Sequence, residues 1–126
     1  MLPTLSFFME VDMLKLSGTK ISLTKGDSAY ITINICKEDG SPYILQEGDE
    51  ISIQVRHKPN GGELLLNGII TDVSEDKFVW YIRPEDTKDA EIKVYYWDAQ
   101  IKTIEGDVYT FIPMTTLRLT DEVTTD

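Results

Sequence analysis

The chain of 126 residues has one cysteine and one histidine, Cys36 and His57. A single cysteine excludes an intramolecular disulfide framework, which suits a reducing compartment, although a disulfide-free extracellular domain would look the same. A single histidine excludes a metal site built from several histidines, and a catalytic triad would depend on His57 alone. The pattern favours Cys36 as a small packing residue at the end of a strand over a nucleophile paired with His57.

Basic residues are also few, because 12 Lys and Arg stand against 22 Asp and Glu, which gives a net charge of −10 and a pI near 4.4. Nucleic acids and anionic membrane surfaces both require clustered basic side chains, so we expect neither as a partner. The acidic residues are spread along the chain, which is typical of a solvated surface. The sequence also lacks an apolar run of the ~20 residues that a membrane helix needs.

Motifs of catalysis are missing as well. The sequence contains no GxSxG elbow and no GxxxxGK[ST] or GxGxxG phosphate loop. Paired carboxylates of a glycosidase are conceivable at Glu85 with Asp86, or at Asp98 with Glu105, but these residues fall in expected turns or on solvent-facing strand positions. We therefore predict a protein that is not an enzyme, with no catalytic residues, no cofactor and no metal site.

A hydrophobic period of two runs through most of the chain from Lys20 onward, and this period predicts β-strands. The segment 29–36 alternates Ile31, Ile33 and Ile35 with polar or aromatic residues. The strands we expect are Lys20–Thr24, Ala29–Cys36, Asp49–His57, Glu63–Val73, Glu75–Ile82 and Ile92–Ile101, with further strands in the segments 103–113 and 115–123. No amphipathic helix is available for parallel crossovers, so the sequence predicts an all-β fold, an antiparallel Ig-like β-sandwich of about seven to nine short strands.

Glycine-containing pairs mark the turns between these strands. Asn60-Gly61 is a strong hairpin signal. Three Gly-Asp pairs, Gly26-Asp27, Gly48-Asp49 and Gly106-Asp107, stand before strands, where glycine permits a left-handed turn and aspartate can accept hydrogen bonds from nearby amides. We interpret all three pairs as hairpin turns, because the ligand spacing of a calcium loop is missing.

The aromatic residues indicate a surface for protein contacts. Tyr95, Tyr96 and Trp97 are consecutive, so a strand must place them on both of its faces. Ile92 and Val94 fall on the parity opposite to Tyr95 and Trp97, which predicts either a bulge near Tyr95 or burial on both faces. The candidates for interface anchors are Tyr81, Tyr96 and Trp97, whereas Trp80 shares the parity of Phe78 and Ile82 and is expected in the core.

The first twelve residues do not follow the two-residue period. The segment 9–13 (MEVDM) can be back-translated to codons in which GGAGGTG, a bacterial ribosome-binding site, precedes the Met13 codon. We therefore expect residues 1–12 to be a mis-annotated leader before a single domain at 13–124, in a bacterial or bacteriophage gene. The alternative is an authentic extension that adds an edge strand through Leu5 to Met9.

The order of several short motifs resembles the N-terminal domain of the baseplate upper protein family and related tail proteins of Firmicutes phages and prophages. The matching positions are Asp39-Gly40, Tyr43, Leu45, Gly48-Asp49, Pro84 to Thr87, Asp98, Gln100, Val108 to Thr110, Pro113 and Glu122 to Thr124. Two places depart from the family pattern, Trp97-Asp98-Ala99 and the turn at Asp89-Ala90-Glu91, and the second leaves the geometry that leads into Ile92 open.

The resemblance implies a β-sandwich that works as a structural or adaptor protein of a phage tail or baseplate. It implies homo-oligomeric assembly and contacts with other tail proteins, synthesis in the bacterial cytoplasm, and a place in the assembled virion. The alternative is a carbohydrate-binding or adhesion module, in which Trp97 or Trp80 would stack on a sugar while Asp98 and Gln100 bind hydroxyls.

Overall fold

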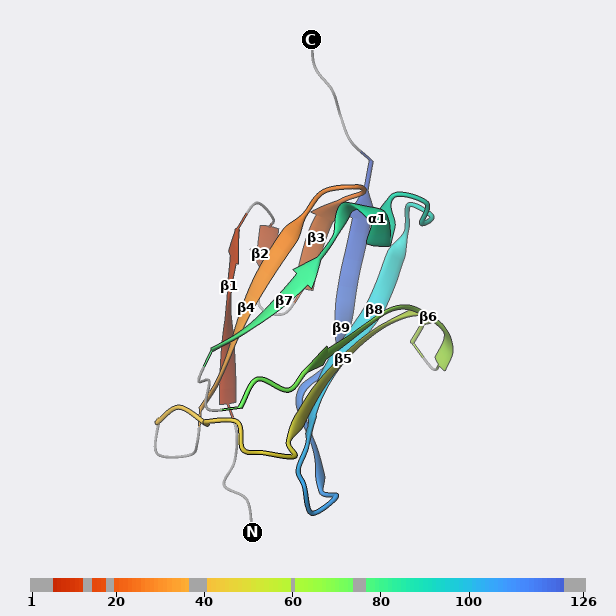
Figure 1. Cartoon of the computed structure of the whole chain (residues 1–126). Coiled ribbons are helices and arrows are strands. Elements are labelled where there is room, and N and C mark those ends of the chain that lie inside the picture. Colours follow the sequence, from red (N-terminus) through yellow and green to blue (C-terminus); the bar gives the residue numbers. More distant parts are fainter. Residues whose placement is uncertain are drawn as a thin grey trace.

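The computed structural model describes residues 6–12, 15–17, 20–36, 41–59, 61–73 and 77–121, and in this part of the chain it is a sandwich of two β-sheets (Figure 1). The elements are β1 (Ser6–Asp12), β2 (Lys15–Ser17), β3 (Lys20–Thr24), β4 (Ala29–Cys36), β5 (Glu50–Lys58), β6 (Gly61–Ile70), β7 (Lys77–Ile82), the helical turn α1 (Pro84–Thr87), β8 (Val94–Lys102) and β9 (Val108–Thr120). The predicted all-β sandwich is confirmed. No helix in the described residues is long and apolar enough to cross a membrane.

The two sheets differ in size. The small sheet has the order β1-β4-β7, and the large sheet has the order β2-β3-β9-β8-β5-β6. In immunoglobulin nomenclature β4 and β7 take the places of strands B and E, while β5, β8 and β9 take those of C, F and G. The large sheet is not purely antiparallel, because β3 pairs parallel with β9 from Ile21↔Leu117 to Thr24↔Thr120.

The core lies between the sheets and consists of the alternate residues that the period of two predicts. Ile31, Ile33 and Ile35 of β4 are fully buried, as are Ile51, Ile53 and Val55 of β5. Each such side chain contributes about 1.5 to 3 kcal/mol when it leaves water, so this alternation fixes which face of each strand turns inward.

Strand β8 is more regular than the sequence indicated. Tyr95, Trp97 and Ala99 are buried, whereas Ile92 and Val94 are exposed. Both predictions made for this strand, burial on both faces and a bulge near Tyr95, are therefore wrong. The irregularity lies in the pairing with β9, whose register shifts on either side of Ala99.

The three Gly-Asp pairs do not share one role. Gly26, Gly48 and Gly106 all have positive φ, at 84°, 90° and 93°, as the sequence predicts. The Gly106-Asp107 pair does close the β8–β9 hairpin. The hairpin prediction is wrong for the other two, because the chain changes sheets between β3 and β4 and again between β4 and β5.

The connection from β7 to β8 contains α1, which the period of two did not predict. Asp86 Oδ2 accepts the Arg83 backbone N–H at 2.8 Å, and Pro84 occupies the first turn, where no backbone donor is needed. Thr87 is fully buried, and its hydroxyl oxygen accepts the Gly26 N–H at 2.9 Å. The segment 84–87 thus ties this connection to the turn between β3 and β4.

The amino-terminal segment takes part in the small sheet. Strand β1 pairs antiparallel with β4 from Ser6↔Cys36 to Asp12↔Tyr30. This is the arrangement that the edge-strand alternative predicts, although residues 1–5 lie outside the described residues. The proposed start at Met13 remains a prediction, and a chain that began there would leave the β1 side of β4 unpaired.

Candidate protein-binding surface

The three interface candidates lie in different environments. Trp97 is 1% exposed and belongs to the core, where its ring centre lies 5.4 Å from that of Trp80. Its Nε1 donates to the Thr116 carbonyl at 3.2 Å, so its polar atom is also satisfied inside the molecule. We correct the expectation for Trp97, because this residue has no free surface to offer a protein or a sugar.

Tyr96 and Tyr81 do not form one patch. Tyr96 is half-buried on the outer face of the large sheet, in register with Arg56 of β5 and Thr116 of β9. Tyr81 lies in β7 on the outer face of the small sheet and is 39% exposed. Of the three candidates, Tyr81 therefore has the accessible surface that an interface anchor needs.

Tyr81 belongs to an exposed stack that the sequence did not single out. Its ring lies parallel to that of Tyr30 in β4, with 4.4 Å between centres and 7° between planes. The two residues are directly paired in the sheet, which brings their rings together. The hydrogen bond between the two hydroxyls raises the pKa of Tyr30. Val79, which shares the outward parity of Tyr81, is 51% exposed, so the stack continues into an aliphatic surface.

A hollow of about 370 Å³ lies next to Tyr81, between β6 of the large sheet and β7 of the small sheet. Its lining combines apolar and polar groups and consists of Leu65, Leu66, Asn67, Gly68, Trp80, Tyr81, Arg83 and Asp86. A Cβ on Gly68 would lie 3.2 Å from Trp80 Cδ1 and 3.3 Å from its Nε1, so glycine lets the indole approach the β6 backbone closely.

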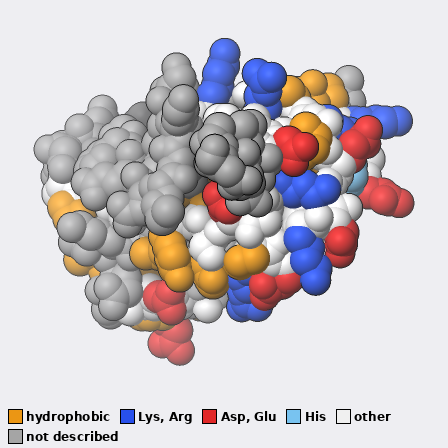
Figure 2. Space-filling view, turned by 90° about the horizontal axis from the view of Figure 1, so that it is seen from above, with side chains coloured by type: hydrophobic (Ala, Val, Ile, Leu, Met, Phe, Trp, Pro, Cys, Tyr) orange, Lys and Arg blue, Asp and Glu red, His pale blue; other side chains and the backbone are white. Residues whose placement is uncertain are grey.

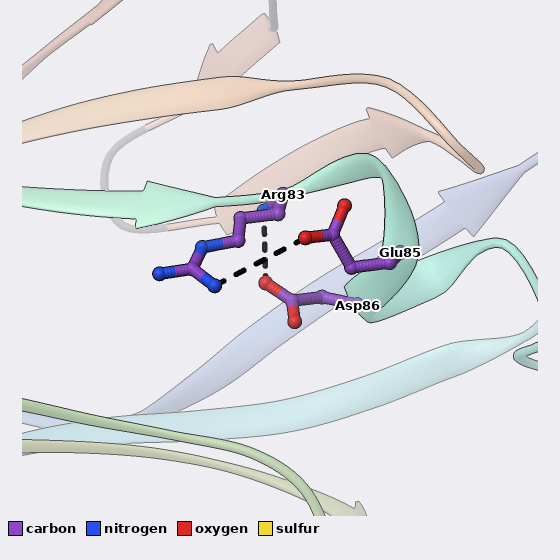
Figure 3. A network of polar contacts seen from close by, with 3 residues as sticks. All are labelled: Arg83, Glu85 and Asp86. Carbon is purple, nitrogen blue, oxygen red and sulfur yellow. Dashed lines mark hydrogen bonds and ion pairs between the residues drawn. The ribbon is translucent and has the colours of Figure 1, made fainter.

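Arg83 stands at the rim of this hollow, between β7 and α1. Its guanidinium lies 5.9 Å from the ring centre of Tyr81 and 4.0 Å from Glu85 Oε1, and both members of the ion pair are well exposed. Figure 3 shows Glu85 and Asp86 on the same side of the turn, facing Arg83. Because the ion pair is exposed, it contributes little to stability.

The carboxylates considered for a glycosidase serve other roles or lie apart. Asp86 accepts the backbone N–H of Arg83 and so closes the first turn of α1. Asp98 lies on the outer face of β8, whereas Glu105 is exposed in the β8–β9 hairpin.

Charges of both signs are interspersed over the α1 end of the molecule rather than gathered in a patch of one sign (Figure 2). Within the described ranges no group of three or more His, Cys, Asp or Glu comes together to hold a metal ion.

His57 lies against a core aromatic residue. The His57 ring meets the ring of Tyr95 edge-on, with 5.2 Å between centres and 69° between planes, so the histidine packs at the end of the core. The side chain of Cys36 lies outside the described residues.

Tyr43 and Asp49, two of the residues on which the resemblance rests, have a structural role. The Tyr43 hydroxyl donates to Asp49 Oδ2 at 2.6 Å, and the same oxygen accepts the Gln46 N–H at 3.0 Å. Burial, followed by the hydrogen bond to Asp49 and its charge, raises the pKa of Tyr43. The sequence predicted that aspartate would bind nearby amides, which Asp49 does.

Tyr95 is a second tyrosine with a structural role. The sequence indicated it only as one of three consecutive aromatic residues. Its hydroxyl donates to the Glu91 carbonyl at 2.7 Å, just before β8. Burial and the Glu91 charge raise the pKa of Tyr95. This contact matches the tyrosine corner of immunoglobulin domains, where a tyrosine near the start of strand F binds upstream backbone.

Comparison with known proteins gives no family assignment. The chain matches no protein-family model and shows no significant similarity to any curated protein. Among solved structures, similar ones include the D270A mutant β-glucosidase from Listeria innocua in complex with laminaribiose, with 11% identity and a TM-score of 0.43, and the same organism's β-glucosidase, with 12% identity and a TM-score of 0.42. Each alignment covers 95% or 96% of this chain but 17% of the other, so the chain spans about a sixth of those enzymes. Likeness at this level carries no argument about activity.

Proposed function

We propose that the chain is a non-catalytic structural or adaptor protein of a phage or prophage tail or baseplate. It acts by packing against further copies of itself and against other tail proteins. It is made in the bacterial cytoplasm and carried in the assembled virion. The family-like motifs are the source of this proposal, and an exposed aromatic surface supports it.

The structural observation that best supports this proposal is the position of the Tyr30–Tyr81 stack. Its two rings and Val79 are exposed on the small sheet, next to the edge of β7. Among the described strands, β7 pairs with β4 and with no other strand. Exposed aromatic side chains beside an unpaired strand edge are typical of surfaces that other proteins cover.

The test is the composition of purified particles. Phage or tail particles are released by prophage induction from the strain that carries the gene, purified on a density gradient, and analysed by quantitative mass spectrometry. We expect the chain in a fixed ratio to the other tail proteins. Particles that infect normally and lack the chain would contradict the proposal.

The carbohydrate-binding alternative now depends on Tyr30 and Tyr81, because Trp97 and Trp80 are 1% and 4% exposed and present no ring face to solvent. Stacked tyrosines can pack against a sugar ring. A glycan array separates the two functions: specific binding that Tyr81→Ala abolishes would favour the carbohydrate-binding module.

A further inference from the structure

In the described residues the small sheet has three strands, one fewer than the four-stranded sheet of an immunoglobulin domain. In immunoglobulin domains a strand D lies beside E in the four-stranded sheet, which corresponds here to the free side of β7. The chain instead passes from β6 to β7 within residues 71–76, and the described part of this connection, 71–73, contains no strand. Strand β6 is the outermost strand of the large sheet and lies at the right of Figure 1. Among the described strands, β6 pairs only with β5 and β7 pairs only with β4, so each has a free edge.

The hollow between β6 and β7 occupies this position and is here named the β7 slot, with the lining residues given above. Its floor includes Leu65 and Leu66, which are half-buried hydrophobic residues packed against the core, and Gly68, which has no side chain. Trp80 also lines it. Apolar side chains of an added strand would fill the space above Leu65 and Leu66.

The two strands that border the slot carry few of the features that protect edges. Neither β6 nor β7 contains proline, and each contains a single charged residue, Glu63 or Lys77. The pairing of β6 with β5 shifts register near Arg56, which is one such feature, so the edge of β7 is the less protected of the two. Natural proteins guard free edges with short strands, charge, bulges or proline, so a largely apolar edge such as that of β7 indicates pairing with another chain.

The acidic charge around the slot indicates which kind of chain would bind there. The segment 61–87 contains six acidic and two basic residues, and the whole protein carries a net charge of −10. Two copies facing each other through this acidic region would repel, whereas a segment with basic ends would be attracted to it. Resting on the proposed function of assembly, we propose that the β7 slot receives an extended strand from a different protein. This strand adds to the edge of β7, places an apolar side chain over Leu66 beside Trp80, and carries lysine or arginine at its ends.

The test uses the full chain and three fluorescent seven-residue probes. The first is Lys-Val-Thr-Val-Thr-Val-Lys, the second has glutamate at both ends, and the third has alternate backbone nitrogens methylated. Fluorescence anisotropy at low salt should show binding of the first probe, about tenfold weaker binding of the second, and none of the third, because the third cannot complete the strand hydrogen bonds. Hydrogen exchange in residues 77–82 should slow when the first probe is bound.

Two variants locate the site. Leu66→Lys places a charge in the floor and should weaken binding at least about tenfold, while Val108→Lys, which adds the same charge at an exposed position of the β8–β9 hairpin, should leave it unchanged. Tyr81→Ala shortens an exposed residue that lines the slot, and it replaces Leu66→Lys as the test variant if Leu66→Lys does not fold. The proposal is overturned if no probe binds, or if both slot variants bind the first probe as tightly as the parent does. It is also overturned if light scattering shows a dimer that Leu66→Lys dissociates, because the occupant of the slot would then be a second copy of the chain. A chain that is present in particles but binds no probe would overturn this inference and leave the proposed function standing.

Discussion

The Tyr43 hydroxyl lies 2.6 Å from Asp49 Oδ2 and donates a buried hydrogen bond to it. Both residues stand in the loop that carries the chain from the small sheet to β5, and Asp49 is 4% exposed. Because a buried carboxylate is costly without donors, this contact holds the loop in one conformation where the chain changes sheets.

Removing the hydroxyl tests this role. Tyr43→Phe leaves Asp49 with the Gln46 amide and should lower the free energy of unfolding by about 1 to 3 kcal/mol. Urea denaturation measures the loss. Tyr96→Phe removes a half-buried hydroxyl from the outer face of the large sheet and should cost about 0.5 kcal/mol or less. Equal losses in the two variants would show that the Tyr43 contact has no special role.

The same tyrosine makes stability depend on pH in the alkaline range. The pKa values of Tyr43 and Tyr95 are raised above the ordinary value of 10.0, so the folded state holds these protons more tightly than the unfolded state. Their contribution is complete below pH 10.0 and is lost as the pH rises above it. Urea denaturation between about pH 8 and about pH 11 should show this decline, and the double variant Tyr43→Phe with Tyr95→Phe should make it shallower, while the raised pKa of Tyr30 still contributes. A decline of unchanged slope in the double variant would assign it to other groups.

The buried position of Trp97 and the exposed position of Tyr81 predict different losses of stability when each is replaced by alanine. Trp97→Ala should cost about 3 to 5 kcal/mol, because it opens a cavity in the core beside Trp80. Tyr81→Ala removes an exposed ring and should cost about 1 kcal/mol or less. A mild effect of Trp97→Ala on thermal unfolding would contradict its placement in the core.

Two glycines of similar conformation allow a matched comparison. Gly48 and Gly106 have φ of 90° and 93°, so alanine costs about 1 to 2 kcal/mol at either position. A Cβ at Gly48 would also lie 2.7 Å from the Ile104 side chain, whereas a Cβ at Gly106 meets nothing within 4 Å. Gly48→Ala should therefore destabilise the protein more than Gly106→Ala does.

Truncating the neighbour identifies the cause of that difference. Ile104 is 69% exposed, so Ile104→Ala should cost little by itself. Added to Gly48→Ala, it should remove the excess loss and bring the double variant to the level of Gly106→Ala. A double variant as unstable as Gly48→Ala would mean that the contact with Ile104 is not responsible.

Much of the fold follows from local pattern. The alternation in 29–36 and 50–58 predicted which residues are buried, since a strand has only two faces. The sheet that each strand joins could not be predicted, because a Gly-Asp turn reads alike whether it closes a hairpin, as at Gly106, or turns the chain to the other sheet, as at Gly26.

The candidate site was harder to predict. Parity placed Trp97 with Ala99 and Ile101, so its burial could have been inferred from the same pattern that found the core. The Tyr30–Tyr81 stack needs the pairing of β4 with β7, which is a contact between strands far apart in sequence. The β7 slot lies beside the edge of β7 that pairs with no other described strand, and no residue pattern marks such a place.

Photocrosslinking in assembled particles tests the central claim, that the chain works by contact with other proteins through the β7 side of the sandwich. The photoreactive residue benzoylphenylalanine replaces Tyr81 in one variant and Val108 in a control, both of which are exposed. After irradiation of purified particles, mass spectrometry should find position 81 joined to another tail protein and position 108 joined to none. Particles that contain the chain but give no crosslink at position 81 would contradict the account.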